Sequence, residues 1–64
     1  MRVNGKVTEL TGTMTLRDLI SKSGFREDRV AVELNGRIVP RSDYDSIRIK
    51  NDDSLEIVGF VGGG

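Results

Sequence analysis

The chain has 64 residues, 36% of them hydrophobic, so it can bury one compact core but not also enclose a catalytic pocket, and we expect a single domain that is not an enzyme. It contains no cysteine and no histidine, which excludes disulfides, thiolate chemistry and the commonest zinc and haem ligands. Ten Lys and Arg residues balance ten Asp and Glu residues, without the basic excess typical of nucleic-acid binding, so we expect no nucleic-acid partner.

The first element is predicted to be a β-hairpin. Asn4-Gly5 separates two short β-prone segments, and Asn-Gly favours a type I′ turn, in which both central residues need a positive φ. We expect its strands at about residues 1–3 and 6–10.

One helix is predicted over residues 16–23. Thr15 is a natural N-cap, and Asp18 three residues later can complete a capping box. Gly24 suits the left-handed position that follows a helix. The apolar residues of the helix follow i, i+3, i+4 spacing on a single stripe: Leu16, Leu19 and Ile20. A helix with one apolar stripe should lie across one face of a small sheet, in a two-layer α+β arrangement.

The second half of the chain is predicted to form another hairpin and a last strand. Val30, Val32 and Leu34 alternate with other residues and should point inward, and Pro40 should end the partner strand because it cannot donate to a ladder. The expected elements are a strand at 30–34, an Asn-Gly turn at 35–36, a strand at 37–39, a helical turn at 42–45, a short extended piece at 47–49, a turn at 51–54 and a last strand at 55–61.

Two pairs of neighbouring carboxylates are the candidates for acid–base or magnesium chemistry, Asp43 with Asp45 and Asp52 with Asp53. Turns use the same residues beside Asn and Ser, and nothing nearby would desolvate these groups and shift their pKa values. We therefore interpret them as turn residues. No phosphate-binding glycine motif occurs, so we predict no catalytic residue, no metal site and no bound cofactor.

No segment is predicted to enter or cross a membrane. No apolar run approaches the length that spans a bilayer, and the first residues do not begin a secretory signal. We expect a cytoplasmic protein without a membrane partner.

The sequence ends in three glycines, which divides it into a folded domain at 1–61 and a flexible tail at 62–64. The tail has two interpretations. It is a frayed or engineered end, or it is an arm that offers the Gly64 carboxylate to the active site of another protein. In the second interpretation Gly62 and Gly63 pass through a channel too narrow for side chains.

The strand before the tail supplies candidate docking residues. Pleat alternation that turns Leu55 and Ile57 inward places Val58 and Phe60 on the outward face, where an aromatic side chain can anchor a partner. The alternative is a bulge at Gly59 that turns Phe60 into the core. The sequence leaves both possibilities open.

Three segments carry a family resemblance: TLRDLI at 15–20, VAVELNGRIVPRS at 30–42 and EIVGFVGGG at 56–64. Together they resemble the ThiS family of sulfur carrier proteins of thiamine biosynthesis, over essentially the whole chain. The resemblance implies a β-grasp (ubiquitin-like) fold, with a small mixed sheet of about five strands and one helix across one face. The first and last strands would lie side by side and parallel at its centre. The first hairpin is shorter than this family leads us to expect.

The resemblance also implies a function that acts on Gly64. A ThiF-like adenylyltransferase would use ATP and magnesium to adenylate its carboxylate. Sulfur derived from cysteine through a cysteine desulfurase would then replace AMP to leave a thiocarboxylate, and a ThiG-like thiazole synthase would accept that sulfur. This agrees with the residues, since a carboxylate of pKa about 3.5 is ionised and a poor electrophile, and the chain itself has no motif that could activate it.

Three alternatives stay open at this stage. The nearest is the small subunit of molybdopterin synthase, which shares the fold, tail and thiocarboxylate chemistry. A second is a ubiquitin-like protein modifier, in which Gly64 would form an isopeptide bond with a lysine. A third is an RNA-associated β-grasp module, which the balanced charge disfavours.

Overall fold

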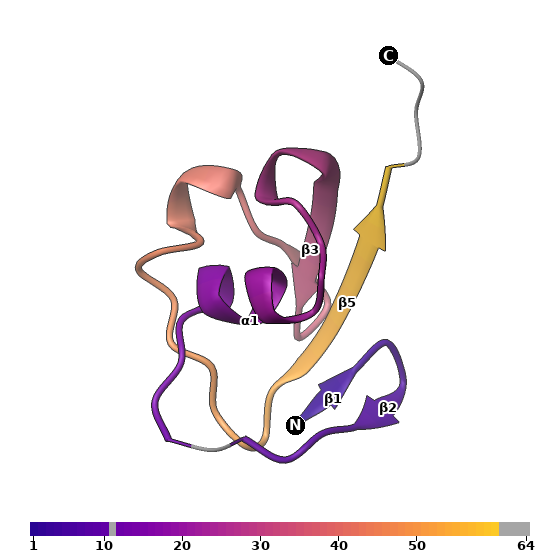
Figure 1. Cartoon of the computed structure of the whole chain (residues 1–64). Helices are drawn as coiled ribbons and strands as arrows, with labels where there is room; N and C mark the ends of the chain where they lie inside the picture. The colour runs from indigo at the N-terminus through magenta and orange to yellow at the C-terminus, as the bar shows by residue number, and fades with distance from the viewer. Residues whose placement is uncertain (11, 61–64) are drawn as a thin grey trace.

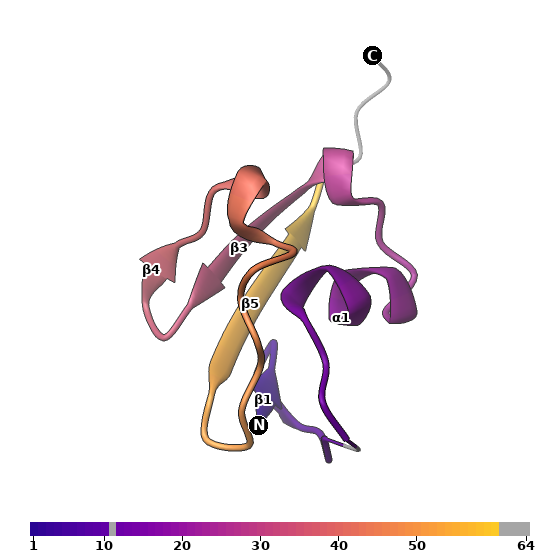
Figure 2. The same cartoon turned by 90° about the vertical axis from the view of Figure 1, so that its left-hand side faces the viewer.

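The computed structural model describes residues 1–10 and 12–60. They form a five-stranded mixed sheet with one α-helix across one face (Figures 1 and 2), which confirms the predicted α+β class. The elements in chain order are β1 (Arg2–Val3), β2 (Lys6–Val7), α1 (Leu16–Lys22), the 3₁₀ helix η1 (Glu27–Arg29), β3 (Val30–Leu34), β4 (Arg37–Ile38), the 3₁₀ helix η2 (Arg41–Asp43) and β5 (Ser54–Gly59). In the part of the chain that the structure describes, no helix is long and apolar enough to cross a membrane.

The sheet has the strand order β2-β1-β5-β3-β4. β1 and β5 are parallel neighbours, as the resemblance implies, and the other pairs are antiparallel. β5 is therefore the central strand, and β3 pairs with it from Val30↔Gly59 to Leu34↔Leu55. The residues that precede the C-terminal tail are thus anchored in the middle of the sheet.

Helix α1 begins at Leu16 as predicted and ends at Lys22, one residue before the predicted end. The Thr15 side chain accepts a hydrogen bond from the Asp18 N–H, and the Asp18 carboxylate accepts one from the Thr15 N–H, both at 3.2 Å. At the other end, Gly24 has φ +85° and the Phe25 N–H donates to the Ile20 carbonyl at 3.2 Å, which is the Schellman arrangement. The capping box and the glycine after the helix are both confirmed.

Both Asn-Gly turns have the predicted positive φ angles, 53° and 80° at Asn4 and Gly5 and 52° and 83° at Asn35 and Gly36. β3 spans residues 30–34 as predicted, whereas β1, β2 and β4 are shorter than predicted. β2 ends at residue 7 instead of 10; its pairing with β1 covers Lys6 and Val7, and the Thr8 N–H then donates to the Met1 carbonyl at 2.9 Å. β4 likewise ends at residue 38 instead of 39, and η1 occupies a segment for which we predicted no helix or strand.

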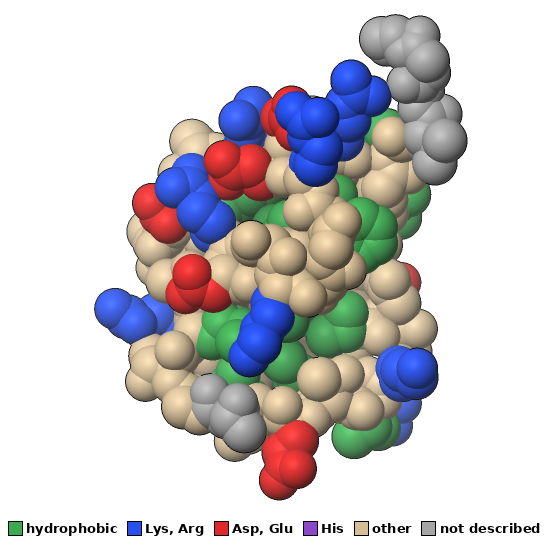
Figure 3. Space-filling view, in the orientation of Figure 1, with side chains coloured by type: hydrophobic (Ala, Val, Ile, Leu, Met, Phe, Trp, Pro, Cys, Tyr) green, Lys and Arg blue, Asp and Glu red, His purple; other side chains and the backbone are tan. Residues whose placement is uncertain are grey.

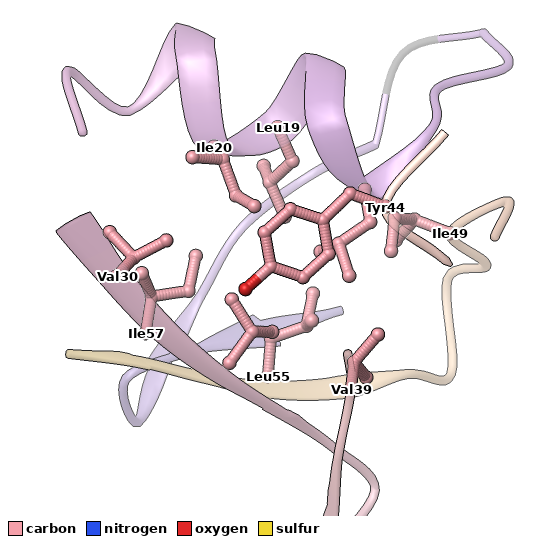
Figure 4. Packing of buried hydrophobic residues seen from close by; sticks show 10 residues of the cluster. Leu19, Ile20, Val30, Val39, Tyr44, Ile49, Leu55 and Ile57 are labelled. Atoms are coloured by element: carbon pink, nitrogen blue, oxygen red, sulfur yellow. The ribbon is translucent and has the colours of Figure 1, made fainter. Parts of the chain in front are cut away.

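The core lies between α1 and the sheet (Figure 4). Tyr44 is its largest fully buried side chain, at 2% exposure, although we predicted it only as part of a helical turn. That turn begins one residue earlier than predicted, at Arg41, and delivers the Tyr44 ring beneath α1. The predicted extended piece at 47–49 is not a strand: Arg48 makes a single bridge with Thr15, and Ile49 is buried. The buried residues are Leu16, Leu19, Ile20, Val30, Val32, Val39, Tyr44, Ile49, Leu55 and Ile57.

Candidate functional site

The C-terminal end of β5 presents two apolar side chains to solvent. Leu55 and Ile57 are buried, whereas Val58 and Phe60 are each 58% exposed. The register with β3 continues without a bulge, since Val30 pairs with Gly59 and the Phe60 N–H donates to the Arg29 carbonyl at 2.7 Å. Of the two orientations that the sequence left open, the outward one is confirmed for Val58 and Phe60, and the one that places Phe60 in the core is wrong.

Other exposed apolar side chains share this face of the sheet, which we call the outer face because α1 covers the opposite one. Directly paired residues on neighbouring strands lie on the same face. The pairs Glu33↔Glu56 and Glu33↔Ile38 put Ile38 on the outer face, and the pairs Arg2↔Ser54 and Arg2↔Val7 put Val7 there. Among the described residues, all the large exposed hydrophobic side chains are thus on the outer face: Val7, Ile38, Val58 and Phe60.

Sequence reasoning found Val58 and Phe60 but missed Ile38 and Val7. Pleat alternation within one strand indicates that Val58 and Phe60 share a face. Whether residues of other strands share that face depends on the register between strands. Each Asn-Gly turn sets the register within its own hairpin. The turn at residues 35–36 could therefore have predicted the pairing of Ile38 with Glu33. Only the pairing with β5 joins the two hairpins on one surface.

On the side of the sheet that faces α1, the end of β5 is held by an aromatic ring. A Cβ built on Gly59 would lie 2.9 Å from Phe25 Cε1 and 3.1 Å from Phe25 Cδ1. The Phe25 ring therefore lies directly on the β5 backbone, and it reaches that position because the helix cap ties the Phe25 N–H to Ile20. The ring contact with Gly59 was not predicted from the sequence.

Gly59→Ala is expected to destabilise the domain by about 1–3 kcal/mol, because the new methyl group and the Phe25 ring cannot occupy the same space. Phe25→Ala removes both ring atoms that would clash, so the double variant should lose less stability than the two single losses added together. Urea unfolding of the wild type and the three variants measures this coupling. Strict additivity would contradict a direct contact between the two residues.

Charged side chains gather around η1 and η2 and are largely paired with one another; Figure 3 shows blue and red groups interleaved at this end of the molecule. Arg17 Nε contacts Glu27 Oε2 at 2.7 Å, and its Nη1 contacts Asp45 Oδ2 at 2.9 Å. Arg26 pairs with Asp28 at 3.1 Å. Burial acts to raise the pKa of Asp28, but the Arg26 charge and the hydrogen bonds to the carboxylate outweigh it, and the pKa lies below its usual value.

The carboxylates considered for metal or acid–base chemistry take part in turns and ion pairs. Asp53 accepts hydrogen bonds from the Asn35 side chain at 3.0 Å and from the Lys50 N–H at 2.7 Å. Asp45 pairs with Arg17. Within residues 1–10 and 12–60, no cluster of three or more acidic side chains could hold a metal ion. Asp45 and Asp53 are therefore turn residues, as we interpreted them from the sequence.

The predicted attachment residue Gly64 and the predicted channel residues Gly62 and Gly63 lie outside the described residues, as does residue 61 at the end of the predicted last strand. The boundary between domain and tail also falls there. The roles of these glycines and the division of the chain at residue 61 therefore stay predictions.

A mixed five-stranded sheet with parallel β1 and β5 at its centre and one helix across one face is the β-grasp fold of ubiquitin-like proteins. A family model, the ThiS family, matches residues 1–64. The chain belongs to the ThiS family.

Individual relatives agree with this assignment. The chain is 35% identical to the sulfur carrier protein ThiS of Bacillus subtilis over 65 aligned positions, covering 100% of this chain and 98% of that protein. The crystal structure of a thiamine biosynthesis protein (ThiS) from Geobacter metallireducens superposes with a TM-score of 0.81 at 33% identity, covering 98% of this chain and 96% of that one.

Two thiazole synthases also contain a similar segment. The chain is 40% identical to that of Paramagnetospirillum magneticum over 62 residues and 36% identical to that of Magnetococcus marinus over 64 residues. It covers 97% and 100% of its own length in these matches but spans only 19% and 20% of the two synthases.

Proposed function

We propose that this chain is the sulfur carrier of thiamine biosynthesis and that it bears the sulfur as a thiocarboxylate on Gly64. The observation that carries the proposal is the match to the ThiS family over residues 1–64, together with full-length similarity to the sulfur carrier protein of Bacillus subtilis. This similarity favours the thiamine carrier over the molybdopterin synthase small subunit.

The proposed cycle begins with activation of the carboxylate. A Gly64 oxygen attacks the α-phosphorus of ATP on a ThiF-like adenylyltransferase, which forms the acyl-adenylate and releases pyrophosphate. A thiol reduces the persulfide that a desulfurase forms from cysteine, the sulfide so released attacks the acyl carbon, and AMP leaves. The product is a thiocarboxylate in which one sulfur atom has replaced one oxygen atom. The ATP and magnesium belong to the partner, and the carrier itself contributes a substrate group.

The acceptor of the sulfur is proposed to be a ThiG-like thiazole synthase. Two relatives support this choice, because a segment similar to this chain is part of proteins named thiazole synthase. Val58 and Phe60 are proposed to dock the carrier on its partners, and Gly62 and Gly63 to pass through the partner's channel. All these proteins would meet in the cytoplasm.

Intact-mass spectrometry tests the proposal. Incubation with the adenylyltransferase, ATP and a sulfur donor should raise the mass of the chain by the difference between sulfur and oxygen, and a reaction without ATP should leave it unchanged. Addition of thiazole synthase and its other substrates should return the mass to that of the carboxylate. No mass change with an adenylyltransferase that is active on another carrier would refute the proposal. A ladder of lysine conjugates would instead indicate a protein modifier.

Phe60→Ala is expected to weaken binding to thiazole synthase by about 2 kcal/mol, roughly 30-fold in Kd, because the exposed ring is the largest side chain beside the tail. The loss of folding stability should stay below about 1 kcal/mol, since the side chain is mostly in solvent. Val7→Ala removes a similarly exposed apolar side chain from β2 and is the matched control. Equal affinities of the wild type and Phe60→Ala would contradict the docking role.

A further inference from the structure

On the edge of β5 that faces β1, the main-chain N–H and C=O groups have hydrogen-bond partners only as far as Ile57 among the described residues. The Asn4 N–H donates to the Leu55 carbonyl at 2.8 Å, after which the chain turns away at Asn4-Gly5. The Asn4 side chain then takes the place of a further strand residue. Its Oδ1 accepts from the Ile57 N–H at 2.6 Å, and its Nδ2 donates to the Ile57 carbonyl at 3.1 Å.

The next main-chain groups on this edge belong to Gly59. Along a strand, the N–H and C=O groups of residues i and i+2 point to the same edge. Because both groups of Ile57 point toward β1, those of Gly59 point the same way, and the Phe60 N–H points to the opposite edge, where it donates to Arg29. Within the described residues no strand lies opposite Gly59 on the β1 side, and Figure 1 shows β1 and β2 beside the lower part of β5 only.

The surroundings of Gly59 limit the direction from which a partner can reach it. The Phe25 ring closes the side that faces α1, and β3 closes the opposite edge through the Arg29–Phe60 hydrogen bond. The β1-side edge of β5 beside Gly59, which we call the free edge, has no neighbouring strand among the described residues. It adjoins the outer face, where Val58 and Phe60 are exposed. A free donor and acceptor spaced as in a strand are complementary to another extended backbone, which is how sheet edges bind peptides.

We propose that an extended segment of thiazole synthase adds to β5 beside Gly59, exchanges main-chain hydrogen bonds with the Gly59 N–H and C=O, and covers Val58 and Phe60. This rests on the proposed function. Thiazole synthase is the chosen occupant because two such synthases hold a segment similar to this chain within one polypeptide, which joins the two covalently and raises their effective concentration for each other. The free edge lies directly before the tail, so the same contact would align the tail with its acceptor.

Amide hydrogen exchange read by NMR tests the proposal on the full chain. In the free protein the Gly59 amide should exchange at nearly the rate of an unstructured peptide, while the Ile57 and Phe60 amides, which have acceptors, should be protected. In the complex with thiazole synthase, exchanged and then dissociated in acid, Gly59 should gain at least about tenfold protection. Ile57 serves as the internal control, since its acceptor lies within this chain.

The outcomes separate this inference from the proposed function. A Gly59 amide that is already protected in the free protein would overturn the inference. So would a complex that shifts the Val58 and Phe60 resonances and leaves Gly59 exchanging freely, since the partner would then dock on the outer face without adding a strand. Neither result would affect the thiocarboxylate proposal, which the intact-mass measurement decides by itself.

Discussion

Deletion of Gly64 is expected to lower the rate of thiocarboxylate formation by more than about 100-fold, because the carboxylate then ends about 3.5 Å short of the activating site. Reacting atoms must come within about 3–3.5 Å of each other, so a displacement of this size removes the acyl oxygen from the nucleotide. Intact-mass measurement after reaction with the adenylyltransferase, ATP and a sulfur donor gives the rate. The free energy of unfolding should not change, because the residue lies beyond β5.

Gly63→Ala is the control that keeps the length of the tail. It places the carboxylate at the original distance but adds one methyl group near the end, so it should slow sulfur loading without abolishing it, and the domain should still fold. A deletion variant that is loaded as fast as the wild type, or that still supports thiazole formation in cells, would refute the role of Gly64.

Tyr44→Ala is expected to destabilise the domain by about 3–5 kcal/mol, which is most of the stability available to a chain of this size. The ring fills the space between α1 and the sheet, with Leu19 and Ile20 on one side and Leu55 on the other (Figure 4). Truncation would leave a cavity that so small a core cannot close. Far-UV circular dichroism during urea unfolding measures the loss.

Tyr44→Phe is the matched control, since it keeps the ring and removes only the hydroxyl. No hydrogen bond joins this hydroxyl to another residue of the described chain, so the change in stability should stay below about 1 kcal/mol. Destabilisation of Tyr44→Phe as large as that of Tyr44→Ala would show that the hydroxyl, and not the ring, supports the core.

The wild type and Tyr44→Phe are also expected to differ in how their stability depends on pH. Burial raises the pKa of Tyr44, and Glu27 adds to this effect while Arg41 opposes it. A pKa that is higher in the folded state stabilises the protein below the pKa of the unfolded state, near 10, and this contribution is lost as the pH rises further. The wild type should therefore lose more stability than Tyr44→Phe above about pH 10. Parallel pH profiles for the two proteins would contradict this.

The features that the sequence predicted correctly depend on neighbouring residues. The Asn-Gly turns need positive φ at two adjacent positions, and the capping box joins Thr15 to Asp18 across one helical turn. Each of these is a local property, so the residue types alone were enough to determine it.

The features that it did not predict join residues far apart in the chain. Tyr44 is buried because the turn after Pro40 packs beneath α1, and the glycine at 59 is needed because Phe25, more than thirty residues earlier, lies against it. The open edge beside Gly59 exists because Asn4 ends the covering strand at Ile57. Thus the sequence alone determined the turns, the caps and the glycine ending. Only the packing of distant segments decided which side chains are buried and which edge of β5 is free, because burial and strand register depend on contacts that local propensities do not encode.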